Sequence, residues 1–68
     1  MRLSPPWHYM LKDLPTNGDD CYFVRFGQVE PPIQGTWELA SLSFIAAISG
    51  EAVAINIIVV HRWRLVTP

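Results

Sequence analysis

With 68 residues, one cysteine and a net charge of −1, this chain has room for one small domain and cannot form an internal disulfide. Half of the residues are hydrophobic and 16% are charged, which is too apolar for intrinsic disorder, and the near-neutral charge excludes a strongly basic nucleic-acid-binding surface. A compact aromatic core, or a second chain that completes it, must therefore supply the stability.

Residues 1–6 are predicted to be an extended leader, because Pro5 and Pro6 interrupt regular structure. The same prolines break the apolar run that a signal peptide requires, and together with the lone cysteine this favours a cytoplasmic protein. Residues 7–11, WHYML, then alternate in the way expected of a strand.

The polar residues 15–20 are predicted to form a turn that leads into the next strand. Pro15 fixes its own φ, whereas Asn17 and Gly18 tolerate the positive φ values that tight turns need. Gly18→Val is therefore expected to damage folding.

The aspartates around this turn do not match a metal or phosphate site. A calcium loop beginning at Asp13 would place Pro15 and Val24 at two ligand positions, and neither side chain can serve. A phosphate-binding loop needs several glycines before a helix, whereas a single glycine precedes a strand here. Cys21 follows two aspartates, whose charge disfavours a reactive thiolate, so it is interpreted as a packed residue. No metal, cofactor or catalytic residue is expected.

Residues 21–26, CYFVRF, are rich in strand-forming side chains. We expect Tyr22 and Val24 to face the core, which would place Phe23 and Arg25 on the surface.

Residues 27–32 are predicted to be a loop, since Pro31 and Pro32 cannot lie in a central strand. Residues 33–39, IQGTWEL, alternate again and place Trp37 among the inward-facing side chains.

The apolar segment Phe44–Val60 has three interpretations. The turn residues 49–51 predict a hairpin, while the alanines favour a helix over residues 43–54. A short membrane span is disfavoured, because Glu51 near its centre would cost roughly 2.5–3.5 kcal/mol on insertion. The β-branched residues of INIIVV, 55–60, predict a strand that continues into HRWRLV.

The tetrad HRWR, residues 61–64, is the strongest candidate for binding. Arg62 and Arg64 share one face of the predicted strand, and Trp63 lies on the other. Arginines beside aromatic side chains are typical of proteins that bind single-stranded nucleic acid, although five basic residues in the whole chain would give a low affinity. The alternative is that Trp63 anchors the core while the arginines keep an edge strand soluble.

Several of these residues form a spaced motif: an N-terminal Trp, Leu-Pro-x-x-Gly, a mid-chain Trp and a late Val-x-x-Trp. The residues that carry it are Trp7, Leu14, Pro15, Gly18, Cys21, Trp37, Val60 and Trp63. In this respect the chain resembles a small domain family of unknown function from phages, prophages and gut bacteria, which usually has Val where Cys21 stands. The resemblance implies a small cytoplasmic β-rich domain of phage or mobile-element origin, and it implies no catalytic residues.

Together these observations predict one domain over residues 1–68, either all-β or α+β. Its antiparallel sheet would have four or five strands, with at most one short helix packed on it. The predicted core is formed by Trp7, Tyr22, Val24, Trp37, Phe44 and Trp63. Because two predicted strands are apolar on both faces, either a helix or a second copy must cover one face, and we therefore expect a homo-oligomer.

Function is predicted at the level of class. The first hypothesis is a non-enzymatic protein-interaction module, and the second is a weak nucleic-acid-binding domain that uses Arg62, Arg64 and exposed aromatics. The candidate interaction surface consists of Arg62, Arg64, Arg25 and Phe23. An enzyme is the third and weakest hypothesis, because no acid–base or nucleophile pair stands out.

Overall fold

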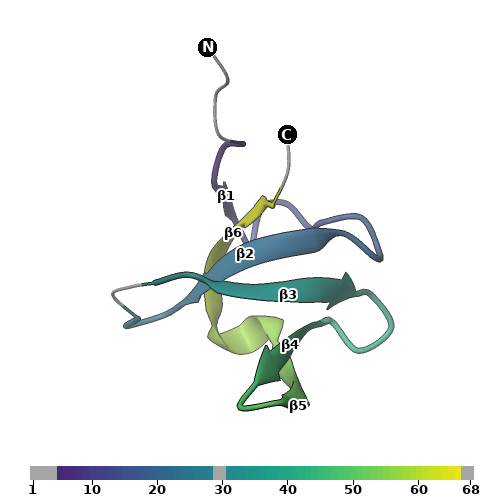
Figure 1. Ribbon diagram of the computed structural model, residues 1–68. Coiled ribbons are helices and arrows are strands. Elements are labelled where there is room, and N and C mark those ends of the chain that lie inside the picture. The colour runs from purple at the N-terminus through teal and green to yellow at the C-terminus, as the bar shows by residue number, and fades with distance from the viewer. Residues whose placement is uncertain (1–4, 29–30, 67–68) are drawn as a thin grey trace.

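The computed structural model describes residues 5–28 and 31–66, which form one six-stranded antiparallel sheet (Figure 1). The strands are β1 (His8–Tyr9), β2 (Asp20–Arg25), β3 (Ile33–Glu38), β4 (Ser43–Ile48), β5 (Glu51–Asn56) and β6 (Val60–Leu65), with the 3₁₀ turn η1 (Ile57–Val59) before β6. Their spatial order is β1-β6-β2-β3-β4-β5. The all-β option is therefore confirmed. Of the predicted leader, residues 1–4 lie outside the described part, and so do residues 29–30 of the predicted loop.

The sixth strand arises where a single long strand was predicted. The Asn56 side chain accepts a hydrogen bond from the Ile58 N–H at 3.0 Å and caps η1. This cap turns the chain, so that β5 pairs with β4 while β6 returns across the molecule to pair with β2. The prediction of four or five strands was wrong because β-propensity does not register an asparagine that caps a helical turn.

The hairpin interpretation of residues 43–56 is confirmed. β4 and β5 pair without interruption from Ser43–Asn56 to Ile48–Glu51. The two loop residues, Ser49 and Gly50, both have positive φ, as a type I′ turn requires. The helix over residues 43–54 was the wrong alternative. Among the described residues, no helix is long and apolar enough to cross a membrane.

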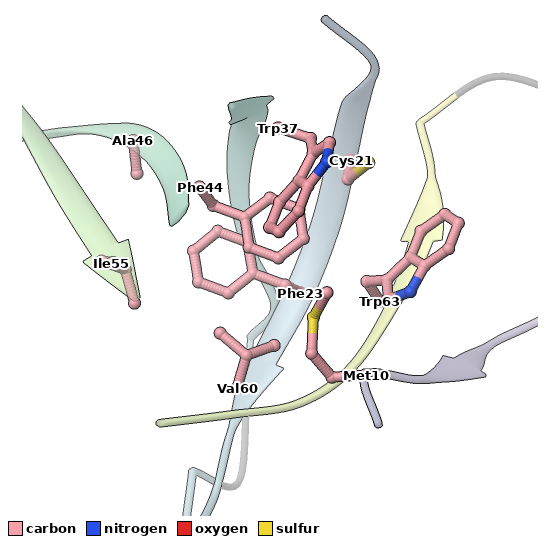
Figure 2. Packing of buried hydrophobic residues seen from close by; sticks show 9 residues of the cluster. All are labelled: Met10, Cys21, Phe23, Trp37, Phe44, Ala46, Ile55, Val60 and Trp63. Carbon is pink, nitrogen blue, oxygen red and sulfur yellow. The ribbon is translucent and has the colours of Figure 1, made fainter. Parts of the chain in front are cut away.

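One face of the bent sheet packs around an aromatic core (Figure 2). The rings of Phe23 and Phe44 stack with their centroids 4.5 Å apart, and Trp37 lies 5.0 Å from Phe44. The buried cluster consists of Met10, Cys21, Phe23, Trp37, Phe44, Ala46, Ile55, Val60 and Trp63. The predicted burial of Trp37, Phe44 and Trp63 is confirmed. The opposite side of the sheet is called the outer face below.

The faces of β2 are the reverse of the prediction. Cys21 and Phe23 are fully buried in the core, whereas Tyr22 is half-buried on the outer face. Phe23 therefore cannot belong to an interaction surface. Its position is fixed by pairing, since Phe23 lies opposite Trp63 of β6, which is itself buried. A strand that is apolar on both faces offers no sequence pattern that distinguishes the two. Val24 is buried, at 4% exposure, but it is not part of the core cluster around Phe23.

The inward face predicted for β3 is confirmed, with Trp37 buried and the alternate residues exposed. Gly35 lies on this inward face at a point of close approach. A Cβ atom there would be 3.1 Å from the Ile45 carbonyl oxygen and 3.1 Å from the Phe23 ring. The missing side chain thus lets β3 and β4 pack on the phenylalanine.

The turn before β2 is confirmed, and it is bonded to the end of β3. Gly18 has φ +90°, and its N–H donates to the Trp37 carbonyl at 2.9 Å. The Asn17 side chain accepts a hydrogen bond from the Leu39 N–H at 2.9 Å, and Pro15 is buried beside it. The turn therefore fixes the position of β2 against β3.

Candidate functional site

The outer face of β6 carries the two arginines singled out in the sequence. Alternation along β6 buries Trp63 and turns Arg62 and Arg64 outward, as predicted. The short strand β1 pairs with β6, placing Tyr9 opposite Arg62. Trp7 precedes Tyr9 by two residues and lies on the same outer face, 38% exposed. The prediction of Trp7 as a core residue was wrong, because the pairing of β1 with β6 directs the side chains of Trp7 and Tyr9 away from the core.

The arginine side chains lie over aromatic rings. The Cζ atoms of Arg62 and Arg64 are 5.0 Å and 5.3 Å from the centre of the Trp7 ring. Arg64 also lies 4.8 Å from the centre of the Tyr22 ring, its cross-strand neighbour. All three distances fall within the range of favourable cation–π contacts. Trp7, Tyr9, Tyr22, Arg62 and Arg64 are called the arginine–aromatic patch.

The patch carries positive charge, and among the described residues no carboxylate pairs with it. Within residues 5–28 and 31–66 the ion pair that forms is His8–Asp13 at 3.7 Å, and neither arginine of the patch takes part in it. The Nε of Arg62 is buried and has no hydrogen-bond partner. A buried donor without a partner is costly, and this N–H group is enclosed by the protein rather than open to an outside acceptor.

A cavity of about 150 Å³ opens on the patch, lined by Trp7, His8, Tyr9 and Arg62. Its base is held in place by contacts with the core. The His8 ring stacks on Trp63 with centroids 4.7 Å apart, and Trp63 donates its indole N–H to the Asp13 carbonyl at 2.9 Å. The cavity therefore has a wall that is fixed before any ligand arrives.

The four predicted surface residues do not gather in one place. Arg62 and Arg64 lie together, Phe23 is in the core, and Arg25 is exposed at the end of β2, beside the irregularity between Val24 and Arg25. The aromatic members of the patch were not predicted as surface residues. The signal that could have revealed them is the alternation of Trp7 and Tyr9, had their pairing partner been known.

Cys21 is fully buried, and its thiol contacts the Asp19 carbonyl at 3.7 Å. Burial raises the pKa of the Cys21 thiol to about 12, and the carboxylates of Asp19 and Asp20 add to the effect. Such a thiol is a poor nucleophile at neutral pH. Among the described residues, no three His, Cys, Asp or Glu side chains form a group that could hold a metal ion.

A second surface lies at the far end of the sheet, where β5 pairs with β4 and, within the described residues, has no neighbour on its other side. Every residue of β5 except Ile55 is exposed. The fold thus defines a small single-sheet β module with a charged patch at one end and an unpaired strand edge at the other. No family model, curated protein or solved structure matches the chain.

Proposed function

We propose that the protein is a small non-enzymatic interaction module that self-associates through the free edge of β5. The observation that carries this proposal is the combination of an unpaired edge and an apolar, exposed strand. Val53 on β5 and its neighbour Ile48 are 37% and 41% exposed. Backbone groups along such an edge are a template for pairing with another chain.

The edge of β5 lacks the features that usually prevent pairing. Natural edge strands carry lysine, proline or a β-bulge, or they are very short. β5 is six residues long, its sequence is EAVAIN, and its register with β4 is unbroken. Its single charged residue, Glu51, lies at one end, which leaves the centre of the strand free to approach a partner.

The positions of the free backbone groups follow from the hairpin. The closing pair of a two-residue loop is hydrogen-bonded, and this pair is Ile48 and Glu51. Bonding then alternates along β5, so that Ala52, Ala54 and Asn56 direct their N–H and C=O groups to the free edge. All three would be bonded in a two-fold antiparallel pair centred on Ala54, where Ala52 lies opposite Asn56 of the second copy.

A second copy fits this edge because of charge and size. With the axis at Ala54, Glu51 lies away from the second copy's Glu51, so like charges are not opposed. On the outer face Ala54 meets Ala54 of the second copy and Ala52 meets Asn56, so the side chains at the axis are small and allow the strands to approach. The core face brings Val53 opposite Ile55 of the second copy and covers apolar surface.

The test uses size-exclusion chromatography with light scattering over a range of concentrations. The full chain is expected to show a species of twice the 7.7 kDa monomer mass. A54K and A54E should each be monomeric, because like charges would face each other across the axis. An equimolar mixture of the two variants should recover the dimer, since opposite charges then meet.

A matched control is Ala47→Lys, which adds the same charge on β4, one strand inside the edge. It should leave the dimer in place. A monomeric full chain at high concentration would overturn the proposal, and failure of the mixed variants to associate would overturn the axis at Ala54.

A phage or mobile-element origin and a cytoplasmic location stay predictions, supported by the motif residues such as Leu14, Pro15 and Gly18. The genes that neighbour this one would test the origin. Phage structural or early genes beside it are expected, and a stable chromosomal operon without mobile elements would contradict it.

A further inference from the structure

We infer that the arginine–aromatic patch is a binding site for single-stranded nucleic acid, in which the arginines bind phosphate and the aromatic rings stack on bases. This site lies at the opposite end of the sheet from β5 and does not depend on self-association. Its components are two guanidinium groups that pair with no carboxylate in the described part of the chain, two exposed aromatic rings, and the cavity that both rings and Arg62 line.

Aromatic contacts hold the arginines in place, and no carboxylate of residues 5–28 and 31–66 pairs with them. The Cζ atom of Arg62 lies 5.0 Å from the centre of the Trp7 ring and that of Arg64 lies 4.8 Å from the centre of the Tyr22 ring, and such cation–π contacts use no N–H donor. The Nε of Arg62 is buried, so the terminal Nη groups of the two arginines are the donors that a phosphate would meet. Guanidinium edges match the oxygens of phosphate in a bidentate way, so the two arginines form a pre-arranged anion site.

The rings provide the second half of the site. Trp7 and Tyr9 are 38% and 57% exposed, on the same face and two residues apart. Side chains two residues apart along an extended chain are about 6.6 Å apart, close to twice the roughly 3.4 Å spacing of stacked bases. The cavity that both rings line, about 150 Å³, can therefore admit one planar base between them.

An acidic peptide is the competing ligand, and the exposed rings favour nucleic acid over it. A carboxylate would be bound by the arginines alone, whereas a base uses the faces of Trp7 and Tyr9 as well. Two cationic contacts also fit a weak, salt-dependent interaction. For single strands the slope of log affinity against log salt is about −0.7 per phosphate contact, which gives about −1.4 here.

The experiment measures fluorescence anisotropy of labelled oligothymidylate with the full-length chain over a series of salt concentrations. An abasic deoxyribose-phosphate strand of equal length and polyglutamate serve as competitors. Oligothymidylate is expected to bind with a slope of about −1.4, the abasic strand at least about tenfold more weakly, and polyglutamate hardly at all.

Variants then separate the two halves of the site. Trp7→Ala should weaken binding about tenfold and leave the salt slope unchanged, because it removes stacking and no charge. R62Q combined with R64Q should flatten the slope by about 1.4. Arg25→Gln removes one charge outside the patch and should change neither quantity. Trp7 lies outside the core, so its variant decides the question even if the double arginine variant fails to fold.

Three results would overturn the site: no binding by the full chain, equal binding of the abasic strand or polyglutamate, or a loss with R25Q as large as with Trp7→Ala. The monomeric A54K variant should keep the same affinity for oligothymidylate. An A54K variant that is monomeric and still binds oligothymidylate would support this site. A full chain that forms the dimer but does not bind oligothymidylate would leave the β5 edge as the single binding surface.

Discussion

The two ends of this sheet are built in opposite ways. At the first end, β1 is two residues long, and the buried Trp63 of β6 joins it to the core. At the second end, β5 is six residues long and five of them are exposed, with Ile55 as its single buried residue. The first is called the closed end and the second the open end.

Contacts between distant parts of the sequence account for the difference. At the closed end, the Trp63 indole bonds the carbonyl of Asp13, fifty positions away, and its ring stacks on His8. At the open end, β5 pairs with its hairpin partner β4 and contributes one side chain, Ile55, to the core. The strands at the closed end carry aromatic side chains such as Tyr9 and Trp63, whereas β5 carries none. The open end is left with a strand that can accept a partner.

The largest expected effect is at Trp63. Trp63→Ala removes a side chain that is 5% exposed, together with its hydrogen bond and its stacking on His8. The free energy of unfolding should fall by about 3–5 kcal/mol, measured by urea denaturation. Val53→Ala at the open end should cost less than about 1 kcal/mol when measured in the monomeric A54K background. Equal losses at the two positions would show that the ends do not differ in this way.

The closed end also shows what the sequence could and could not predict. The alternation in β6 gave the correct faces for Trp63 and for Arg62, because one face carries charge. The alternation in β2 could not be interpreted, since Tyr22 and Phe23 are both large and aromatic. Which of them is buried depends on the pairing of Phe23 with Trp63, a contact across forty residues. Periodicity is a local signal and carries no information on that pairing.

The candidate site, too, was predicted where it depends on alternation within one strand and missed where it depends on pairing between strands. Arg62 and Arg64 follow from alternation within one strand. The rings beneath them come from β1 and β2, through the pairs Tyr9–Arg62 and Tyr22–Arg64. The open end was easier, because a type I′ loop and its hairpin are local. The sequence did not predict where β5 ends. The reason is also local, because the Asn56 side chain caps η1 and strand propensity does not register such a cap.

A moderate effect is expected at the turn that serves the closed end. Gly18 has φ +90°, and a Cβ there would meet nothing within 4 Å. Gly18→Val should therefore cost about 2 kcal/mol through backbone strain alone, without a steric clash. Gly18→Asn should cost less, because asparagine tolerates positive φ. Thermal denaturation of both variants checks this, and equal melting temperatures for the valine variant and the parent would show that the turn does not need its glycine.

The smallest effect concerns pH, and it reports on the core beside the closed end. Cys21 lies opposite Leu65 of β6, and burial raises the pKa of its thiol from 9.0 to about 12. Above pH 9 the unfolded chain loses this proton while the folded chain keeps it, so stability falls as pH rises toward 12. At pH 10 the loss should be about 1 kcal/mol.

The control for this pH dependence is Cys21→Ala, which has no thiol to ionise. Tyrosine and lysine titrations are common to both proteins, so the difference between their stability–pH curves isolates the cysteine. Moving the thiol to the open end, as V53C in the C21A background, should abolish the difference, since Val53 is 37% exposed and a thiol there ionises alike in the folded and unfolded chains. A parent curve that runs parallel to the C21A curve from pH 8 to pH 11 would mean that water reaches Cys21. The core beside the closed end would then exclude water no better than the exposed edge at β5.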